Sequence, residues 1–151
     1  MEFAIDLHIH SALSPCGDRD MTPNNIVNMC ILKGIDIFSV TDHNSAANLP
    51  PISKVAMENG IMLLPGLEVQ TKEEIHLLCY FKNVEQALDF GNIIYETLPS
   101  IANDEALFGE QLLMDHEDNV VGKMDKLLLS SCDISVNDLF KIVKSFDGVC
   151  V

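Results

Sequence analysis

Short apolar runs alternate with amphipathic segments along the first half of the chain. Consecutive apolar side chains predict strands at residues 3–5, 35–40, 61–64 and 75–80. Apolar side chains that recur every three or four residues predict helices at residues 23–33, 52–59 and 84–98. Thr22 before Pro23 is typical of a helix start, and Gly34 of a helix end. The third strand is expected to continue past Pro65 into residues 66–69.

Strands that alternate with helices indicate β-α-β units and a largely parallel sheet or barrel, so the predicted fold class is α/β. In such folds, functional side chains gather where the strands end. Five side chains that can carry chemistry lie at predicted strand ends: His8, His10, Asp42, His43 and Glu68. The pattern therefore predicts that these positions, far apart in sequence, share one rim of the fold.

The second half of the chain is less regular. Residues 108–114 and 120–124 are predicted to form a hairpin around the polar turn 115–119, and Ser135 with Asp138 resembles a capping box before a last helix. Residues 148–151 begin like a further strand. We therefore expect one domain over residues 1–151 that is truncated at its C-terminus.

The amino-acid composition mainly excludes certain classes of protein. Hydrophobic residues make up 48% of the chain, as in globular proteins, and 23 acidic against 9 basic residues give a net charge of −14. That balance argues against a surface for long nucleic acids, which needs clustered Lys and Arg, but not against a phosphate held through cations. No apolar run reaches the ~20 residues of a membrane span and no signal peptide is visible, so the cytoplasm is the expected location.

Histidines and carboxylates at the strand ends suggest metal binding. His8 and His10 are two residues apart in a strand and therefore point the same way, and imidazole is a common ligand of Zn, Mn and Fe. Asp6 is expected on the same face, where it would orient a ligand, and Asp42 beside His43 would do the same.

Two further positions extend the predicted metal site. Glu68 can bridge two cations, because a carboxylate has two oxygens to share. His76 is either an additional nitrogen ligand or a satisfied histidine of an apolar strand. His116 lies between two acidic residues in the hairpin turn and is assigned no role. The five cysteines are an odd number without a C-x-x-C pair, so they are expected to be reduced thiols.

Taken together, these segments resemble the PHP family (polymerase and histidinol phosphatase). The resemblance covers residues 3–80 and is carried by residues 6–11 (DLHIHS), 41–44 (TDHN), 66–68 (GLE) and His76. It implies a distorted (β/α)7 barrel, incomplete in this chain, and a site for two or three divalent metal ions (Zn, Mn or Fe). The implied activity is hydrolysis of phosphate monoesters or diesters by metal-activated water.

The resemblance also implies which residues hold the metals. His8 and His10 would bind the first metal, and Glu68 would bridge to a second that is also held by His76. His43 would bind a third metal with a ligand from the loop after the first motif.

The chain departs from the family pattern at two places. Many relatives have Ser-Asp-Gly in the loop after the first motif, whereas residues 14–18 here are SPCGD. Asp18 is the expected loop ligand, with Cys16 as the alternative, because a thiolate is also a good zinc ligand. The later Pro-x-His and Asp-x-His motifs of the family have no counterpart in residues 1–151.

The expected substrate is a small phosphate ester, a nucleotide or a short oligonucleotide, with no role for membranes. A catalytically incomplete, structural or polymerase-associated binding module is the alternative, and a metal-free barrel fragment is a third possibility. No side chain is predicted to act as a nucleophile.

Overall fold

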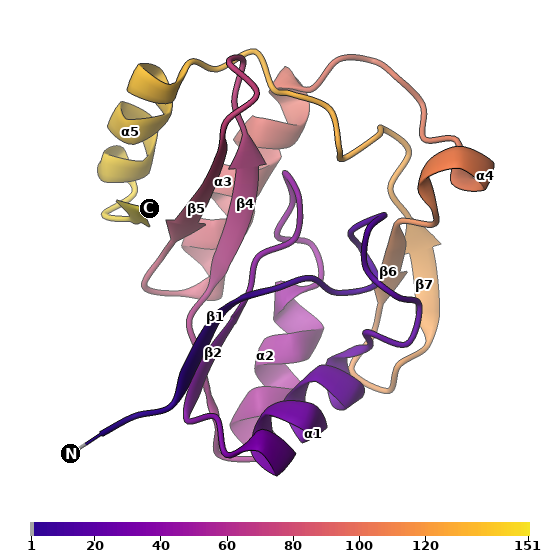
Figure 1. The fold of residues 1–151 in the computed structure, drawn as a ribbon, viewed down its shortest axis with the longest axis vertical. Helices are drawn as coiled ribbons and strands as arrows, with labels where there is room; N and C mark the ends of the chain where they lie inside the picture. The colour runs from indigo at the N-terminus through magenta and orange to yellow at the C-terminus, as the bar shows by residue number, and fades with distance from the viewer. Residues whose placement is uncertain (1) are drawn as a thin grey trace.

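The computed structural model describes residues 2–151 and arranges most of them around two small sheets. The first sheet is parallel, in the order β1 (Ile5–Ile9), β2 (Ile37–Val40) and β3 (Met62–Leu63). The second is antiparallel, in the order β4 (Gly66–Gln70), β5 (His76–Tyr80) and β8 (Val149–Cys150). Figure 1 shows the parallel sheet in the lower half of the molecule and the β4–β5 pair in the upper half.

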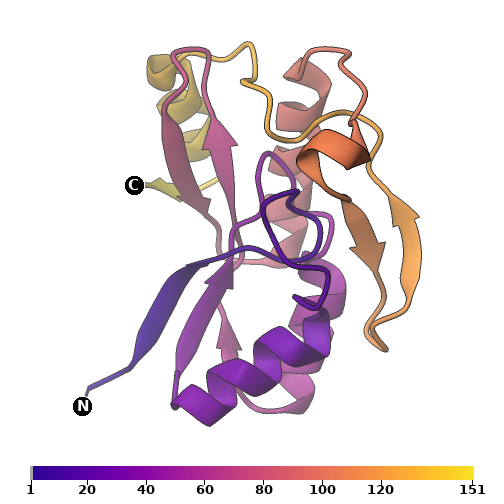
Figure 2. The same ribbon diagram turned by 45° about the vertical axis from the view of Figure 1, so that its right-hand side comes forward.

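Five helices and one further hairpin complete the fold. The helices are α1 (Pro23–Lys33), α2 (Leu49–Glu58), α3 (Val84–Thr97), α4 (Glu105–Phe108) and α5 (Val136–Ser145). In Figure 1, α1 and α2 accompany the parallel sheet, whereas α3 lies behind β4 and α5 flanks β5. Strands β6 (Leu112–Met114) and β7 (Val120–Lys123) form a hairpin that stands at the opposite side of the molecule from β5 in Figure 2. Along residues 2–151, no helix combines the length and hydrophobicity that crossing a bilayer requires.

Helix α1 begins and ends where the sequence predicted. The Thr22 side chain accepts a hydrogen bond from the backbone N–H of Asn25, and Gly34 adopts the left-handed conformation at the other end. Helix α2 begins at Leu49, three residues before its predicted start, with prolines in its first turn. A proline there sacrifices no helical hydrogen bond, so these residues lengthen the helix instead of ending it.

The mixed α/β class is confirmed, but the sheet is not largely parallel. Residues 61–64 and 66–69 do not form one strand, because the chain changes sheets at Pro65: β3 pairs with β2 and β4 pairs antiparallel with β5. Only residues 71–75 connect β4 to β5, and so short a link cannot make a parallel crossover. None of the three sheets within residues 2–151 closes into a barrel.

The predicted hairpin around residues 115–119 is confirmed with a shorter first strand. Residue 108 ends α4, a short helix that the sequence pattern did not predict, and β6 begins only at Leu112. The Asp104 side chain caps α4 by accepting a hydrogen bond from the backbone N–H of Ala106.

The two sheets share one hydrophobic core and one backbone junction. In the core, the ring of Phe90 lies 4.9 Å from that of Phe81 and 5.8 Å from that of Phe146. At the junction, the segment after β2 bonds to β4: the Asn44 N–H donates to the Glu68 carbonyl at 2.8 Å, and the Glu68 N–H donates to the Asp42 carbonyl at 3.0 Å. This junction places the end of β2 beside the middle of β4.

Candidate metal centre

Four histidines surround the carboxylate of Glu68 at this junction. Oε2 of Glu68 lies 3.1 Å from Nε2 of His8, 3.1 Å from Nε2 of His10 and 3.5 Å from Nδ1 of His43. Its other oxygen, Oε1, lies 2.7 Å from Nδ1 of His76. We call these five residues the His/Glu cluster. All five were predicted as ligands from the sequence, and the structure brings them together.

Each residue of the His/Glu cluster reaches it from a different place in the fold. His8 lies in β1 and His10 directly after it, His43 follows β2, Glu68 lies in the middle of β4, and His76 begins β5. Glu68 and His43 are buried, whereas His8 and His76 are exposed. The cluster therefore has a buried floor and an open side from which a ligand can approach.

The charges of the buried pair suit metal binding at neutral pH. Burial tends to raise the pKa of Glu68, but hydrogen bonds from His10, His8 and His76 and the charge of His43 outweigh it and lower the pKa to about 2. Burial lowers the pKa of His43 to about 4, although the charge of Glu68 opposes this. The carboxylate is thus ionised and the imidazole neutral, which are the forms that bind cations.

Asp42 is held by two serines, and one of them, Ser14, links it to the cluster. Its carboxylate accepts hydrogen bonds from the Ser11 N–H at 2.7 Å, the Ser11 hydroxyl at 2.6 Å and the Ser14 hydroxyl at 2.7 Å. Burial raises the pKa of Asp42, and these hydrogen bonds work in the opposite direction. The Ser14 oxygen lies 3.0 Å from Nδ1 of His10 and accepts a hydrogen bond from the His43 N–H. Sequence reasoning assigned Ser14 no role, and a serine in a loop gives no signal that would have revealed one.

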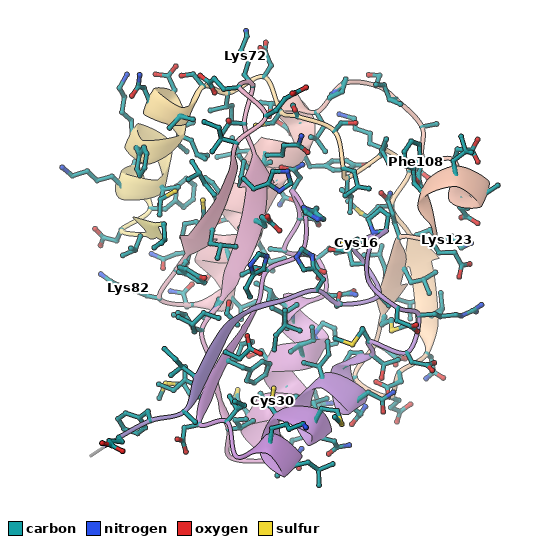
Figure 3. All side chains as sticks on the ribbon, in the orientation of Figure 1. Cys16, Cys30, Lys72, Lys82, Phe108 and Lys123 are labelled. Atoms are coloured by element: carbon teal, nitrogen blue, oxygen red, sulfur yellow. The ribbon has the colours of Figure 1, made fainter. Side chains whose placement is uncertain are left out.

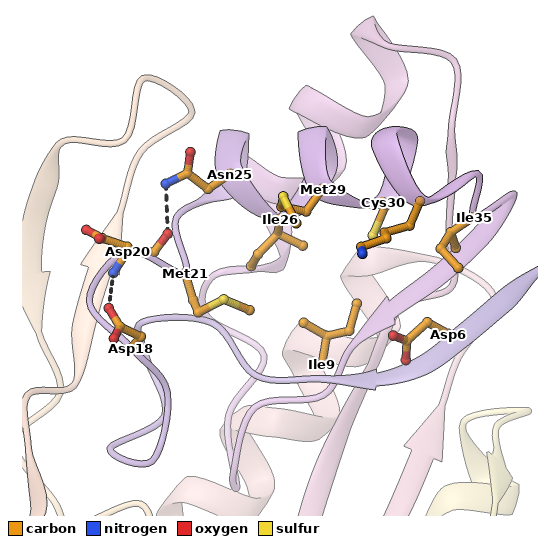
Figure 4. Close-up of a pocket in the computed structure, with 11 residues that line it drawn as sticks. Asp6, Ile9, Asp18, Asp20, Met21, Asn25, Ile26, Met29, Cys30 and Ile35 are labelled. Carbon is orange, nitrogen blue, oxygen red and sulfur yellow. Dashed lines mark hydrogen bonds between the residues drawn. The ribbon is translucent and has the colours of Figure 1, made fainter.

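Asp6 does not share the face of His8 and His10. The pairing of β1 with β2 shifts register between Asp6 and Ile9, and this irregularity breaks the strict alternation of side chains. Asp6 and Ile9 both line a groove between β1 and α1, which Figure 4 shows in close-up. The Asp6 carboxylate accepts a hydrogen bond from the backbone N–H of His8 at 3.3 Å. It therefore contacts the backbone beside the cluster and not an imidazole ring.

The loop after β1 presents Cys16, not Asp18, to the cluster. In Figure 4, Asp18 lies at the end of the groove, where its carboxylate accepts a hydrogen bond from the Asp20 N–H at 2.9 Å. Within residues 2–151, Asp18 belongs to no group of side chains close enough to share a metal ion. Cys16, labelled in Figure 3, lies with its Sγ 3.9 Å from Nδ1 of His10.

The donor atoms fit divalent cations. Nε2 of His8 and Nε2 of His10 lie 3.1 Å apart, and each is 3.1 Å from Glu68 Oε2, so three donors form a nearly equilateral triangle. Ligands about 2.1 Å from one cation are separated by roughly such distances. Nδ1 of His43 is buried and has no hydrogen-bond partner within residues 2–151. An unpaired buried nitrogen is costly unless something binds it, and a cation would remove that cost.

Comparisons with known proteins agree with this geometry. The family model described as PHP domain matches residues 6–143. The 5'-3' exoribonuclease Rnm of Escherichia coli is 28% identical over 126 residues, which is 72% of this chain and 42% of that protein. The chain spans less than half the length of the curated relatives that it matches.

Solved structures of two relatives share the fold. A metal-dependent phosphoesterase from Bifidobacterium adolescentis has a TM-score of 0.63 at 19% identity, over 99% of this chain and 66% of that one. The lesion-specific endonuclease Q from Pyrococcus furiosus has a TM-score of 0.68 at 17% identity, over 99% of this chain and 34% of that one. At 19% and 17% sequence identity, these two comparisons show a similar fold only.

Proposed function

The chain belongs to the PHP domain family, and from this premise we propose that it is a metal-dependent phosphoesterase that hydrolyses a phosphate monoester or diester. The observation that carries the proposal is the ionised, buried Glu68 with four imidazoles around it. A carboxylate that uses both oxygens toward different histidines is suited to bridging two cations.

The proposed roles follow from which oxygen of Glu68 each histidine faces. His8 and His10, beside Oε2, would hold a first cation, and His76, beside Oε1, would hold a second. His43 completes the centre from its buried side. Divalent Zn, Mn or Fe, if bound by these residues, would supply an activated water at near-neutral pH and would neutralise phosphate oxygens. Asp42 keeps the centre in place through Ser14.

The substrate range that we propose is wider than the sequence analysis expected. Relatives named as an exoribonuclease and a lesion-specific endonuclease favour a nucleic-acid phosphodiester alongside small phosphate esters. The net charge of −14 then requires that cations, more than Lys or Arg side chains, meet the phosphate. The chain spans only part of the length of its relatives, so we propose a seven-stranded barrel and phosphoesterase activity for the whole protein as well.

The test compares His8→Ala with a matched control. His116, the fifth histidine, lies in the β6–β7 turn, so His116→Ala removes an imidazole without touching the cluster. Metal content per chain is measured by plasma mass spectrometry on protein purified without chelators or a histidine tag. Hydrolysis of p-nitrophenyl phosphate, its bis-ester and a labelled short RNA and DNA is measured in parallel.

We expect wild type and His116→Ala to bind two or more transition-metal ions per chain and to hydrolyse at least one substrate, and His8→Ala to lose the activity. Full metal content and an unchanged rate in His8→Ala would refute the assignment. Metal binding without hydrolysis of any substrate would instead favour the binding-module alternative.

A further inference from the structure

Two thiols face each other across the β5–β8 pair, outside the His/Glu cluster. All five cysteines are free, but Sγ of Cys79 lies only 3.7 Å from Sγ of Cys150. Cys79 is fully buried in the hydrophobic core, whereas Cys150 packs against the same core and is partly exposed. The pair therefore combines a protected thiol with one that a small molecule can reach.

The pairing of the strands places these thiols in a position suited to a disulfide. Cys79 and Cys150 lie directly opposite each other, and the neighbouring residues Leu78 and Val151 exchange two N–H···O bonds of 2.9 Å. Because such pairs alternate in an antiparallel ladder, the two cysteines form a non-hydrogen-bonded pair, with Cα atoms about 4.5 Å apart. Disulfides join Cα atoms about 4.4–6.8 Å apart. The bond can therefore form without separating the strands.

The turn between α5 and β8 holds Cys150 in this place. In Figure 1, α5 leads directly into β8, which lies beside β5. The Gly148 N–H donates to the Val143 carbonyl at 3.0 Å, so the chain turns back tightly at the end of α5. A Cβ on Gly148 would lie 2.8 Å from the ring of Phe81, so the backbone itself packs against the residue that follows β5. The thiols are thus brought together by the fold and not by flexible side chains alone.

The two thiols differ in how readily they ionise. The hydrogen bond with Cys150 and burial both raise the pKa of Cys79. The same hydrogen bond lowers the pKa of Cys150, although burial opposes this. Cys79 therefore keeps the shared proton, and the thiolate forms on the partly exposed Cys150. The thiolate is the form of cysteine that attacks other sulfur atoms.

We propose that Cys79 and Cys150 are a redox modification site, which a small disulfide oxidises to a cross-strand disulfide that fastens β8 to β5. The Cys150 thiolate attacks one sulfur of the small disulfide, forms a mixed disulfide and displaces one thiolate, which accepts the proton of Cys79. The Cys79 sulfur then attacks the Cys150 sulfur and displaces the second thiolate, which takes a proton from solvent. Two protein thiols are oxidised, and one small disulfide is reduced to two thiols.

This site is separate from the proposed metal centre. Cys79 is three residues after His76 in β5, and side chains an odd number of residues apart point to opposite faces of a strand. His76 faces Glu68, whereas Cys79 belongs to the hydrophobic core. Oxidation therefore leaves the cluster in place. It closes a loop from residue 79 to residue 150, which restricts the unfolded chain and so favours the folded one.

The test identifies the linked cysteines directly. Every protein carries Cys16→Ser, because the exposed Cys16 would otherwise react with the same reagent. This parent is compared with versions that also carry Cys150→Ala or, as the matched control, Cys132→Ala, which removes another buried thiol. Each folded protein is incubated with oxidised glutathione and a chelator, quenched with acid, and analysed by intact mass and peptide mapping. Urea unfolding and circular dichroism are recorded before and after oxidation.

We expect the parent and the Cys132→Ala protein to yield peptides linked through Cys79 and Cys150, with a mass loss of about 2 Da for the two hydrogens removed. Their urea midpoints should rise on oxidation, and dithiothreitol should reverse both changes. The Cys150→Ala protein should show neither change. A parent without this link would overturn the proposal, whether it is unmodified, carries a stable glutathione adduct on Cys150 or links Cys79 to Cys132. An unaltered urea midpoint in the linked parent would refute the fastening of β8.

Discussion

Asp42 illustrates how residues outside the His/Glu cluster support the proposed metal centre. The buried carboxylate accepts three hydrogen bonds from Ser11 and Ser14, and Ser14 in turn contacts the ring of His10 and the backbone of His43. Residues that orient metal ligands in this way influence affinity almost as strongly as the ligands do.

Asp42→Asn is therefore expected to weaken metal binding by about 10–100-fold, because the amide replaces one acceptor oxygen by a donor and misaligns Ser14. Isothermal titration with Zn²⁺ measures the effect. Asp133→Asn is the matched control, since Asp133 is exposed and its ion-pair partner, Lys72, is exposed as well. Equal affinities in the two variants would show that Asp42 does not position the ligands.

The two buried ionisable residues of the His/Glu cluster are expected to make the metal-free protein sensitive to acid. The folded-state pKa of His43, about 4, is below its ordinary value of 6.5, so the unfolded chain binds this proton first and stability falls as the pH drops from 6.5 to 4. Glu68, with a pKa of about 2 against 4.5, stabilises the fold above pH 4.5 and loses that contribution below it. Both effects have the same sign.

Urea unfolding in the presence of a chelator is expected to show a lower midpoint at pH 4.5 than at pH 7.5. His43→Gln removes the buried imidazole and should flatten the part of the profile between pH 6.5 and 4. An unaltered slope in that interval would contradict the assignment to His43.

At the scale of helices and strands, the sequence predicted those features that depend only on neighbouring residues, such as helix ends. Thr22 and Gly34 identified the ends of α1, because capping involves neighbouring residues only. The change of sheet at Pro65 and the bulge beside Asp6 were not predictable, because both depend on which strand lies next to the segment. The path of the loop from Ser11 to Gly17 was likewise not predictable, and it brings Cys16, not Asp18, close to His10 and His43.

Gly17→Ala tests this loop. The new Cβ meets the Ser11 carbonyl at 2.3 Å, so the backbone must move, and we expect a loss of about 1–3 kcal/mol in the free energy of unfolding together with weaker metal binding. Gly122→Ala in β7 is the control, because its Cβ would meet nothing closer than Leu113 Cδ1 at 3.5 Å. Urea unfolding of both variants measures the difference, and equal stabilities would show that the loop tolerates the shift.

At the scale of the molecule, the sequence predicted which side chains come together better than the architecture that holds them. The five residues of the His/Glu cluster could be singled out because a candidate metal site needs particular side chains, whatever sheet carries them: His8, His10, His43, Glu68 and His76. The arrangement into a parallel and an antiparallel sheet was missed, because apolar runs of similar length fit either kind of pairing.

Because the cluster joins the two sheets, bound metal is expected to stabilise the whole fold. Zn²⁺ at a hundred times its dissociation constant should raise the free energy of unfolding by about 2.7 kcal/mol for one site. Thermal unfolding with and without Zn²⁺ measures this, and chelator should reverse the gain. A midpoint that does not respond to Zn²⁺ would mean that the folded chain binds it no better than the unfolded chain does.

The backbone junction between Asn44 and Glu68 also dictates when the centre can form during synthesis. His8 and Glu68 are 60 residues apart, so the first histidines leave the ribosome well before the carboxylate that they surround. The β1–α1–β2 unit can fold early because its contacts are local, but β4 with Glu68 and β5 with His76 must be translated and docked before the His/Glu cluster is complete. A nascent chain that stalls before β4 therefore carries His8, His10 and His43 without Glu68 and His76, and we expect it to bind a cation more weakly than the complete cluster does.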